Sequence, residues 1–94
     1  MGRLDEAEAD AVAAQRTLEA ILDAEPRDTE AQGLLAAALA GRAKVAGRRG
    51  DRDGAAALWD QALARQEALA RDNPRSRRDL ERLRVDRVAA SSTP

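Results

Sequence analysis

The chain has no cysteine and no histidine, and these absences remove the side chains on which many known sites depend. Without cysteine there are no disulfide bonds and no thiolate metal sites. Without histidine there is no imidazole base for a Ser-His triad and no imidazole ligand for zinc. The composition therefore argues against a stand-alone enzyme, and it predicts neither a cofactor nor a metal site.

Aromatic residues are almost absent as well, since Trp59 stands alone and there is no Phe or Tyr. The core of this 94-residue chain must therefore consist of Ala, Leu and a few Val. Such a core buries little area per residue, which predicts closely packed helices and modest stability. No apolar run is long enough to span a membrane, and the first residues lack a signal-peptide core, so we expect a soluble, cytoplasmic protein.

Acidic and basic residues are unevenly distributed, although the net charge is only −1. Residues 1–32 contain nine acids and three Arg, a balance of −6, whereas residues 33–94 contain eight acids and thirteen bases, a balance of +5. An acidic front and a basic back can support head-to-tail contact between copies, or contact with a neighbouring domain. Alternatively, both halves are solvated surfaces, because salt screens exposed charges within about 10 Å.

The apolar residues recur at steps of three and four, which predicts four helices, at about residues 3–24, 28–49, 52–72 and 76–88. Pro26 and Pro74 end the first and third helices, and Gly50 supplies the positive φ that ends the second. We expect one domain over residues 1–90 and a disordered tail over 91–94. The predicted buried stripes, in chain order, are Leu4, Ala7, Ala11, Ala14, Leu18 and Ile21; Leu34, Leu35, Ala38, Leu39, Val45 and Ala46; Ala55, Leu58, Trp59, Ala62, Leu63, Leu69 and Ala70; and Leu80, Leu83, Val85 and Val88.

The chain repeats itself at a spacing of 48 residues. Identical residues at this spacing include the pairs Gly2 and Gly50, Asp5 and Asp53, Ala7 and Ala55, Ala14 and Ala62, Pro26 and Pro74, and Arg27 and Arg75. Ala matches are frequent by chance in an Ala-rich chain, but Gly, Asp, Pro and Arg matches are not. Self-similarity at a fixed period is the signature of a repeat protein.

The helix after Gly50 has Ala55, Trp59 and Ala62 at the spacing of the A-x3-F pattern, and it resembles the second helix of a tetratricopeptide repeat. The long repeat also resembles arrays in large bacterial multidomain proteins, as do Asn73-Pro74 and Arg78-Asp79-Leu80. This resemblance implies an all-α fold in which antiparallel helical hairpins stack as a short right-handed solenoid. Ala55, Trp59, Ala62, Gly50, Pro26 and Pro74 would then be structural residues.

The same resemblance implies a non-catalytic protein–protein interaction module, a scaffold or adaptor at the end of a longer repeat array. The alternatives are a self-assembling structural protein, or a regulatory domain of a larger signalling enzyme. Because the first helix of each hairpin lines the concave face in this family, Arg42, Arg49, Arg78 and Arg82 are candidates for contact with a protein or peptide partner, which can be acidic. We expect no nucleic acid and no membrane as a partner, since acids are interleaved with the Arg-rich stretch after Pro74 and no aromatic stacks bases.

Arg42 interrupts the apolar stripe of the second helix. Counting residues back from Pro26 and forward to Gly50 sets Arg42 level with Asp10 and with Trp59. One interpretation is that Arg42 pairs with Asp10 and lies over the Trp59 ring. The alternative is that its aliphatic stem lines the edge of the core and its guanidinium reaches water.

The segment Asp51-Arg52-Asp53-Gly54 has two interpretations. It resembles the start of a calcium-binding loop, but a third ligand and the closing Glu are missing. An Asp before a helix is also a standard N-cap, which needs no metal. We therefore interpret this segment as a helix cap, and Arg49-Gly50-Asp51 as a turn.

Overall fold

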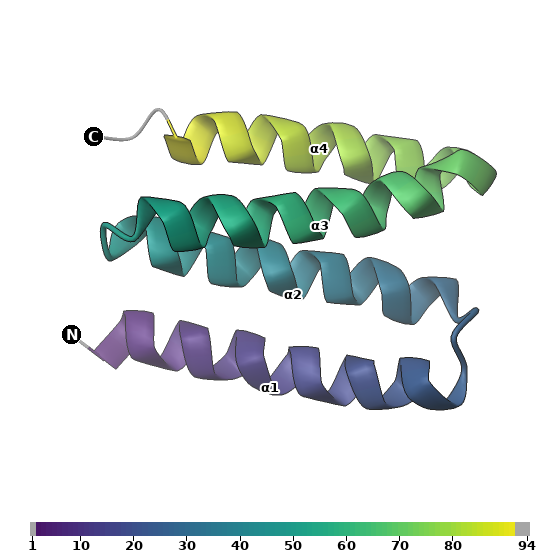
Figure 1. Ribbon diagram of the computed structural model, residues 1–94, viewed down its shortest axis with the longest axis horizontal. Coiled ribbons are helices and arrows are strands. Elements are labelled where there is room, and N and C mark those ends of the chain that lie inside the picture. The colour runs from purple at the N-terminus through teal and green to yellow at the C-terminus, as the bar shows by residue number, and fades with distance from the viewer. Residues whose placement is uncertain (1, 92–94) are drawn as a thin grey trace.

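The computed structural model of the protein describes residues 2–91. These residues form four α-helices and no strand: α1 (Gly2–Ala24), α2 (Thr29–Arg48), α3 (Arg52–Asp72) and α4 (Pro74–Ser91). Each helix runs antiparallel to the one before it, and the four lie in chain order from α1 to α4 (Figure 1). The prediction of an all-α protein with four helices is confirmed.

Two aspartates and one glycine set the helix ends. The carboxylate of Asp28 accepts the N–H of Ala31 at 3.0 Å and caps α2, and that of Asp51 accepts the N–H of Gly54 at 2.9 Å and caps α3. Between α2 and α3, Gly50 has a φ of 83°, a conformation that residues with a Cβ rarely adopt. Asp51 is therefore used as a helix cap.

The ends of α4 differ from the prediction. The helix begins at Pro74 rather than Ser76, because the first position of a helix has no use for an N–H and suits the fixed φ of proline. It continues to Ser91, because Ala89 and Ala90 are good helix formers. The predicted disordered tail is thus wrong for Ser91, and its remaining residues, 92–94, lie outside the described residues.

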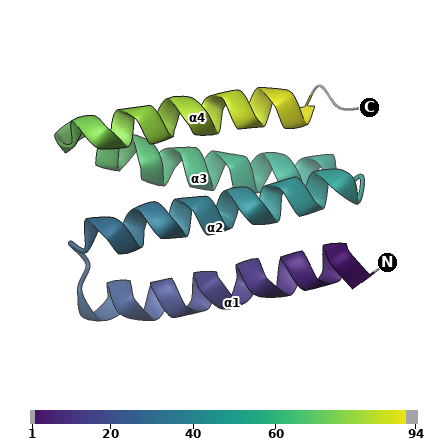
Figure 2. The same cartoon turned by 180° about the vertical axis from the view of Figure 1, so that it is seen from behind.

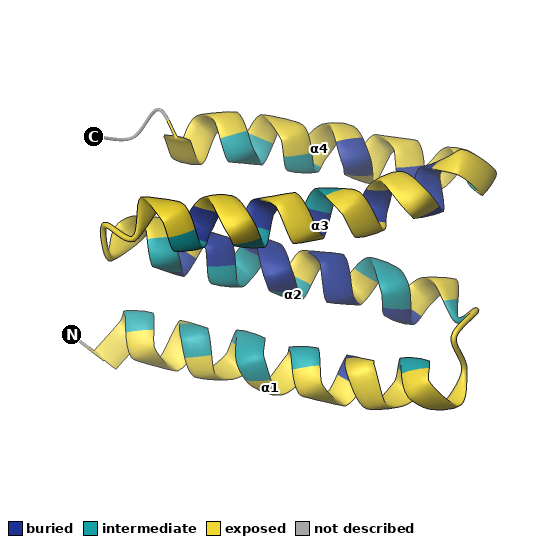
Figure 3. Ribbon diagram, in the orientation of Figure 1, coloured by how far each residue is buried: buried dark blue, intermediate teal, exposed yellow. Residues whose placement is uncertain are grey.

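The core is centred on α2, which packs against α1, α3 and α4 (Figure 3). Leu35 and Leu39 of α2 are 1% and 2% exposed, and Trp59 of α3 packs into the same cluster at 3%. Within the described residues, α1 has no contact with α3 or α4. The two outer helices therefore each bury less of their surface than α2 and α3 do.

The predicted stripe of α1 is wrong in part, because the structure leaves Ala7, Ala14 and Ile21 exposed. Only Leu18 of α1 is buried, and the residues that face α2 beside it are half-buried. These half-buried residues are Leu4, Glu8, Ala11, Val12, Gln15 and Leu22. The stripe spans two adjacent faces of the helix, and α1 has a neighbour on one face only.

Three further residues predicted in the core are exposed: Leu34 at 52%, Val85 at 64% and Val88 at 65%. Conversely, Gln66 is 2% exposed although it was not expected in the core. Its side-chain amide donates to the Ser76 carbonyl oxygen at 2.9 Å, so its polar group is satisfied. Apolar spacing identified the helices, but it did not identify which of their faces would be covered.

Candidate functional site

A groove of about 530 Å³ runs between α2 and α4. Its walls come from these two helices, and Gln66 and Leu69 of α3 contribute to its floor. Figure 2 views the molecule from the side on which α2 lies in front of α3, with α4 beside them. We call this feature the α2/α4 groove.

Small residues on α2 keep the groove open. Gly33, Ala37 and Ala40 follow one another at helical spacing along the wall, so no long side chain of α2 fills the space at these positions. Leu34 stands next to Gly33, lines the groove and is 52% exposed. The groove therefore presents an apolar side chain to solvent above a narrow backbone surface.

Charged residues of both signs line the groove. Lys44 of α2 and Asp86 of α4 form an ion pair across it, with 3.6 Å between Nζ and Oδ2. The side chains of Arg82, Glu30 and Asp79 also line the groove, and none of the three forms an ion pair with another described residue. Three acids against two bases give the groove no basic excess.

The structure does not bring the four candidate arginines together. Arg49 forms ion pairs with Asp5 and Glu8 of α1, and Arg42 also faces α1. Arg82 lines the α2/α4 groove, whereas Arg78 is exposed on α4 outside it. Of the four, only Arg82 lies where a ligand in the groove would meet it.

Arg42 has a different partner from the one predicted. Its Nη1 donates to Gln15 Oε1 at 2.7 Å, and within the described residues it forms no ion pair with Asp10 and no ring contact with Trp59. Asp10 is exposed on the side of α1 that does not face α2, so counting from Pro26 chose the wrong residue of that helix. Arg42 itself is half-buried.

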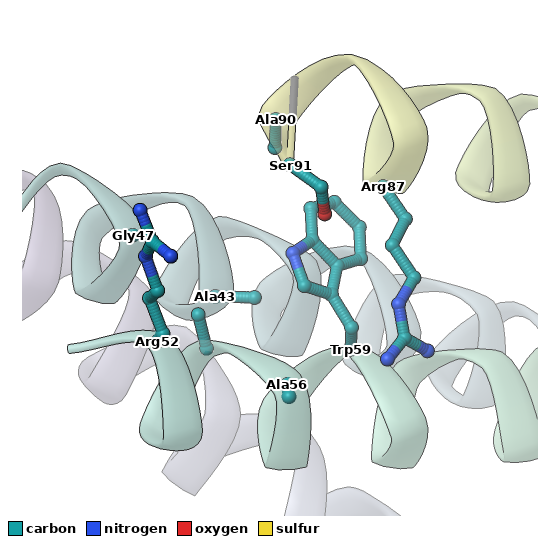
Figure 4. Close-up of a pocket in the computed structure, with 9 residues that line it drawn as sticks. Ala43, Gly47, Arg52, Ala56, Trp59, Arg87, Ala90 and Ser91 are labelled. Carbon is teal, nitrogen blue, oxygen red and sulfur yellow. The ribbon is translucent and has the colours of Figure 1, made fainter. Parts of the chain in front are cut away.

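A second, smaller pocket of about 310 Å³ lies beside Trp59. Ala90 and Ser91 of α4 lie over the indole, and Arg87 extends past it toward α3 (Figure 4). Arg87 donates to Asp60 at 2.8 Å, which ties α4 to α3 next to the ring. Because the indole is almost fully covered by these contacts, Trp59 acts here in packing α3 against α2 and α4.

The sequence reasoning missed the groove residues Leu34, Lys44, Gln66 and Asp86. Leu34 was assigned to the core, and the other three are polar residues scattered over three helices. The signal that was available is the series of small residues on one side of α2. That series shows where a neighbouring helix or a ligand can approach closely, but not which of the two does so.

Comparison with protein-family models, with curated proteins and with solved structures gives no match for this chain. Across residues 2–91, no helix is both long and apolar enough to cross a membrane. In the same range, no three acidic side chains are clustered in a way that would hold a metal ion. A functional assignment therefore has to be argued from the geometry of the α2/α4 groove.

Proposed function

We propose that the chain is a tetratricopeptide-like interaction module that binds a segment of a partner protein in the α2/α4 groove. In this proposal α2 and α4 take the place of the first helices of two consecutive hairpins, which line the concave face in that family. The α2/α4 groove is the observation that carries the proposal, because it combines an exposed leucine with charged side chains that have no ion-pair partner.

Equivalent packing in the two halves of the chain supports the repeat. Leu18 of α1 and Gln66 of α3 are 48 residues apart, and both are buried. Gln66 contacts the start of α4, and Leu18 belongs to the core built around α2. The α1–α2 pair and the α3–α4 pair therefore bury the same repeat position, as two units of a stacked array would.

The groove indicates what kind of segment it would take. A side chain from the partner can pack on Leu34, where exposed apolar area is available. Arg82 on one wall and Glu30 on the other then offer charge-assisted hydrogen bonds to groups of opposite sign. We therefore propose an amphipathic peptide with an apolar anchor flanked by charges of both signs. An acidic partner is one member of this class.

The test is selection from a displayed library of random peptides, with the full chain immobilised. Selected peptides should share an apolar residue flanked by charged residues. The Leu34→Asp substitution should weaken their binding at least about tenfold, because it places a carboxylate where the anchor packs. Calorimetry with the synthesised peptide measures this loss.

The matched control is Ile21→Asp, which changes another exposed apolar residue, on α1. It carries the same charge change and lies away from the groove, so peptide affinity should stay within about twofold of the unmodified chain. Equal losses in the two variants would refute binding in the groove, as would a selection that enriches no peptide.

A further inference from the structure

The internal repeat identifies an apolar face of α1 that has no neighbour. At the spacing of 48 residues, Ala7, Ala14 and Ile21 of α1 correspond to Ala55, Ala62 and Leu69 of α3. The three α3 residues are buried, and Ala55 and Ala62 lie in the cluster built around α2. Their counterparts on α1 are exposed, and Figure 3 shows the side of α1 away from α2 open to solvent. We call this surface the α1 open face.

The opposite end of the row has an open surface too. Val85 of α4 is 64% exposed, and Arg78, two turns earlier on the same side of the helix, is exposed. The Arg78 side chain makes no ion pair or hydrogen bond with the other described residues. This surface is distinct from the α2/α4 groove, and we call it the α4 open face.

The order of the helices makes these two faces complementary. Neighbouring helices alternate in direction, and α1 and α4 therefore run antiparallel (Figure 1). A second copy placed further along the row would bring its α1 next to α4 in the antiparallel orientation of every neighbouring pair. Its Ala7, Ala14 and Ile21 would then meet α4 as Ala55, Ala62 and Leu69 meet α2.

We propose that the α1 open face of one copy docks on the α4 open face of another, so that the chain assembles head to tail. The contact reproduces between copies the packing of α3 on α2 within one copy. A heterologous contact of this kind does not close on itself in a dimer, so the assembly grows into rings or open chains.

Charge favours this pairing over contact between like faces. The helix α1 contains six acids and two Arg, a balance of −4, whereas α4 contains six Arg and three acids, a balance of +3. On the α1 open face, Asp10 has no ion-pair partner among the described residues, and Arg78 is its counterpart in sign on α4. Two α1 faces would repel each other, and so would two α4 faces.

Light scattering coupled to size exclusion tests the proposal with the full chain at several concentrations and two salt concentrations. The mean mass should rise with protein concentration at low salt, and it should fall toward the monomer mass at high salt, where screening shortens the reach of the charges. A monomer under all these conditions would overturn the proposal.

Two variants distinguish head-to-tail docking from any symmetric dimer. Ala14→Arg blocks the α1 open face and Val85→Arg blocks the α4 open face, and both positions are exposed, so the fold should persist with an unchanged helical circular dichroism signal. Each variant alone should be monomeric. An equimolar mixture should form a one-to-one dimer that grows no further, because each protein contributes the face that the other has lost.

The control is Ala57→Arg, which adds the same charge at an exposed position of α3, and it should assemble like the unmodified chain. A mixture of Ala14→Arg and Val85→Arg that stays monomeric would overturn the proposal. So would a variant that remains dimeric alone, because it would show a symmetric contact through one face.

Discussion

At the scale of single residues, the two copies of the repeat place different chemistry at the same position. Leu18 of α1 and Gln66 of α3 are both buried, but only Gln66 carries a polar group. Its amide is satisfied by the carbonyl oxygen of Ser76, at the start of α4. The hydrogen bond joins α3 to α4, so Gln66 has a role that an apolar residue could fill through packing alone.

We predict that Gln66→Ala lowers the free energy of unfolding by about 2 kcal/mol, because it leaves a cavity and removes the hydrogen bond to Ser76. Gln66→Leu should cost less than about 1 kcal/mol, since Leu18 occupies the corresponding position in the other copy. Urea unfolding followed by circular dichroism measures both values. A larger loss for Leu than for Ala would contradict this interpretation.

At the scale of helices, the ends could be predicted from the sequence and the buried faces could not. Pro26, Gly50, Asp51 and Pro74 act on their own neighbours in the chain, so their effect can be predicted from local chemistry. Which face of α1 is covered depends on where α2 lies, and Ala7 has the same sequence context whether it is covered or exposed. The groove was missed for the same reason, since its walls are distant in sequence.

Two glycines near the end of α2 test the backbone argument directly. A Cβ added at Gly47 or at Gly50 would meet no atom within 4 Å, so steric contact is not what separates them. Gly47→Ala should raise the free energy of unfolding by about 0.5–1 kcal/mol, because Gly47 is helical and Ala favours helix. Gly50→Ala should lower it by about 1–2 kcal/mol, because its φ of 83° is strained for Ala. Equal effects of the same sign in thermal unfolding would contradict this account.

Close approach of α2 and α3 depends on small residues, and Ala62, which is 0% exposed, is the most direct test. Ala62→Leu should cost about 1–3 kcal/mol of unfolding free energy, because the added atoms have no space between the helices. The exposed Ala57 of the same helix is the control, and Ala57→Leu should change the unfolding free energy by less than about 0.5 kcal/mol. A tolerated Ala62→Leu would show that the helices are not held at this close distance.

At the scale of the whole molecule, the row of four helices has a radius of gyration of 13.2 Å and offers two kinds of surface. The α2/α4 groove lies along its side, between alternate helices, and the two open faces lie at its ends. Binding of a partner segment and assembly of copies therefore use separate residues. The repeat accounts for both, since stacking equivalent units creates grooves along the stack and leaves open faces at its ends.

The most direct test of the central claim is a nuclear magnetic resonance titration of the labelled chain with a selected peptide, at a fixed protein concentration. Binding in the groove predicts that the amide signals of Leu34 and Leu83 shift in proportion to the bound fraction, while those of Ala7 and Ala14 on α1 stay in place. Shifts confined to α1, or no shift at saturating peptide, would contradict the proposal that the α2/α4 groove is the binding site.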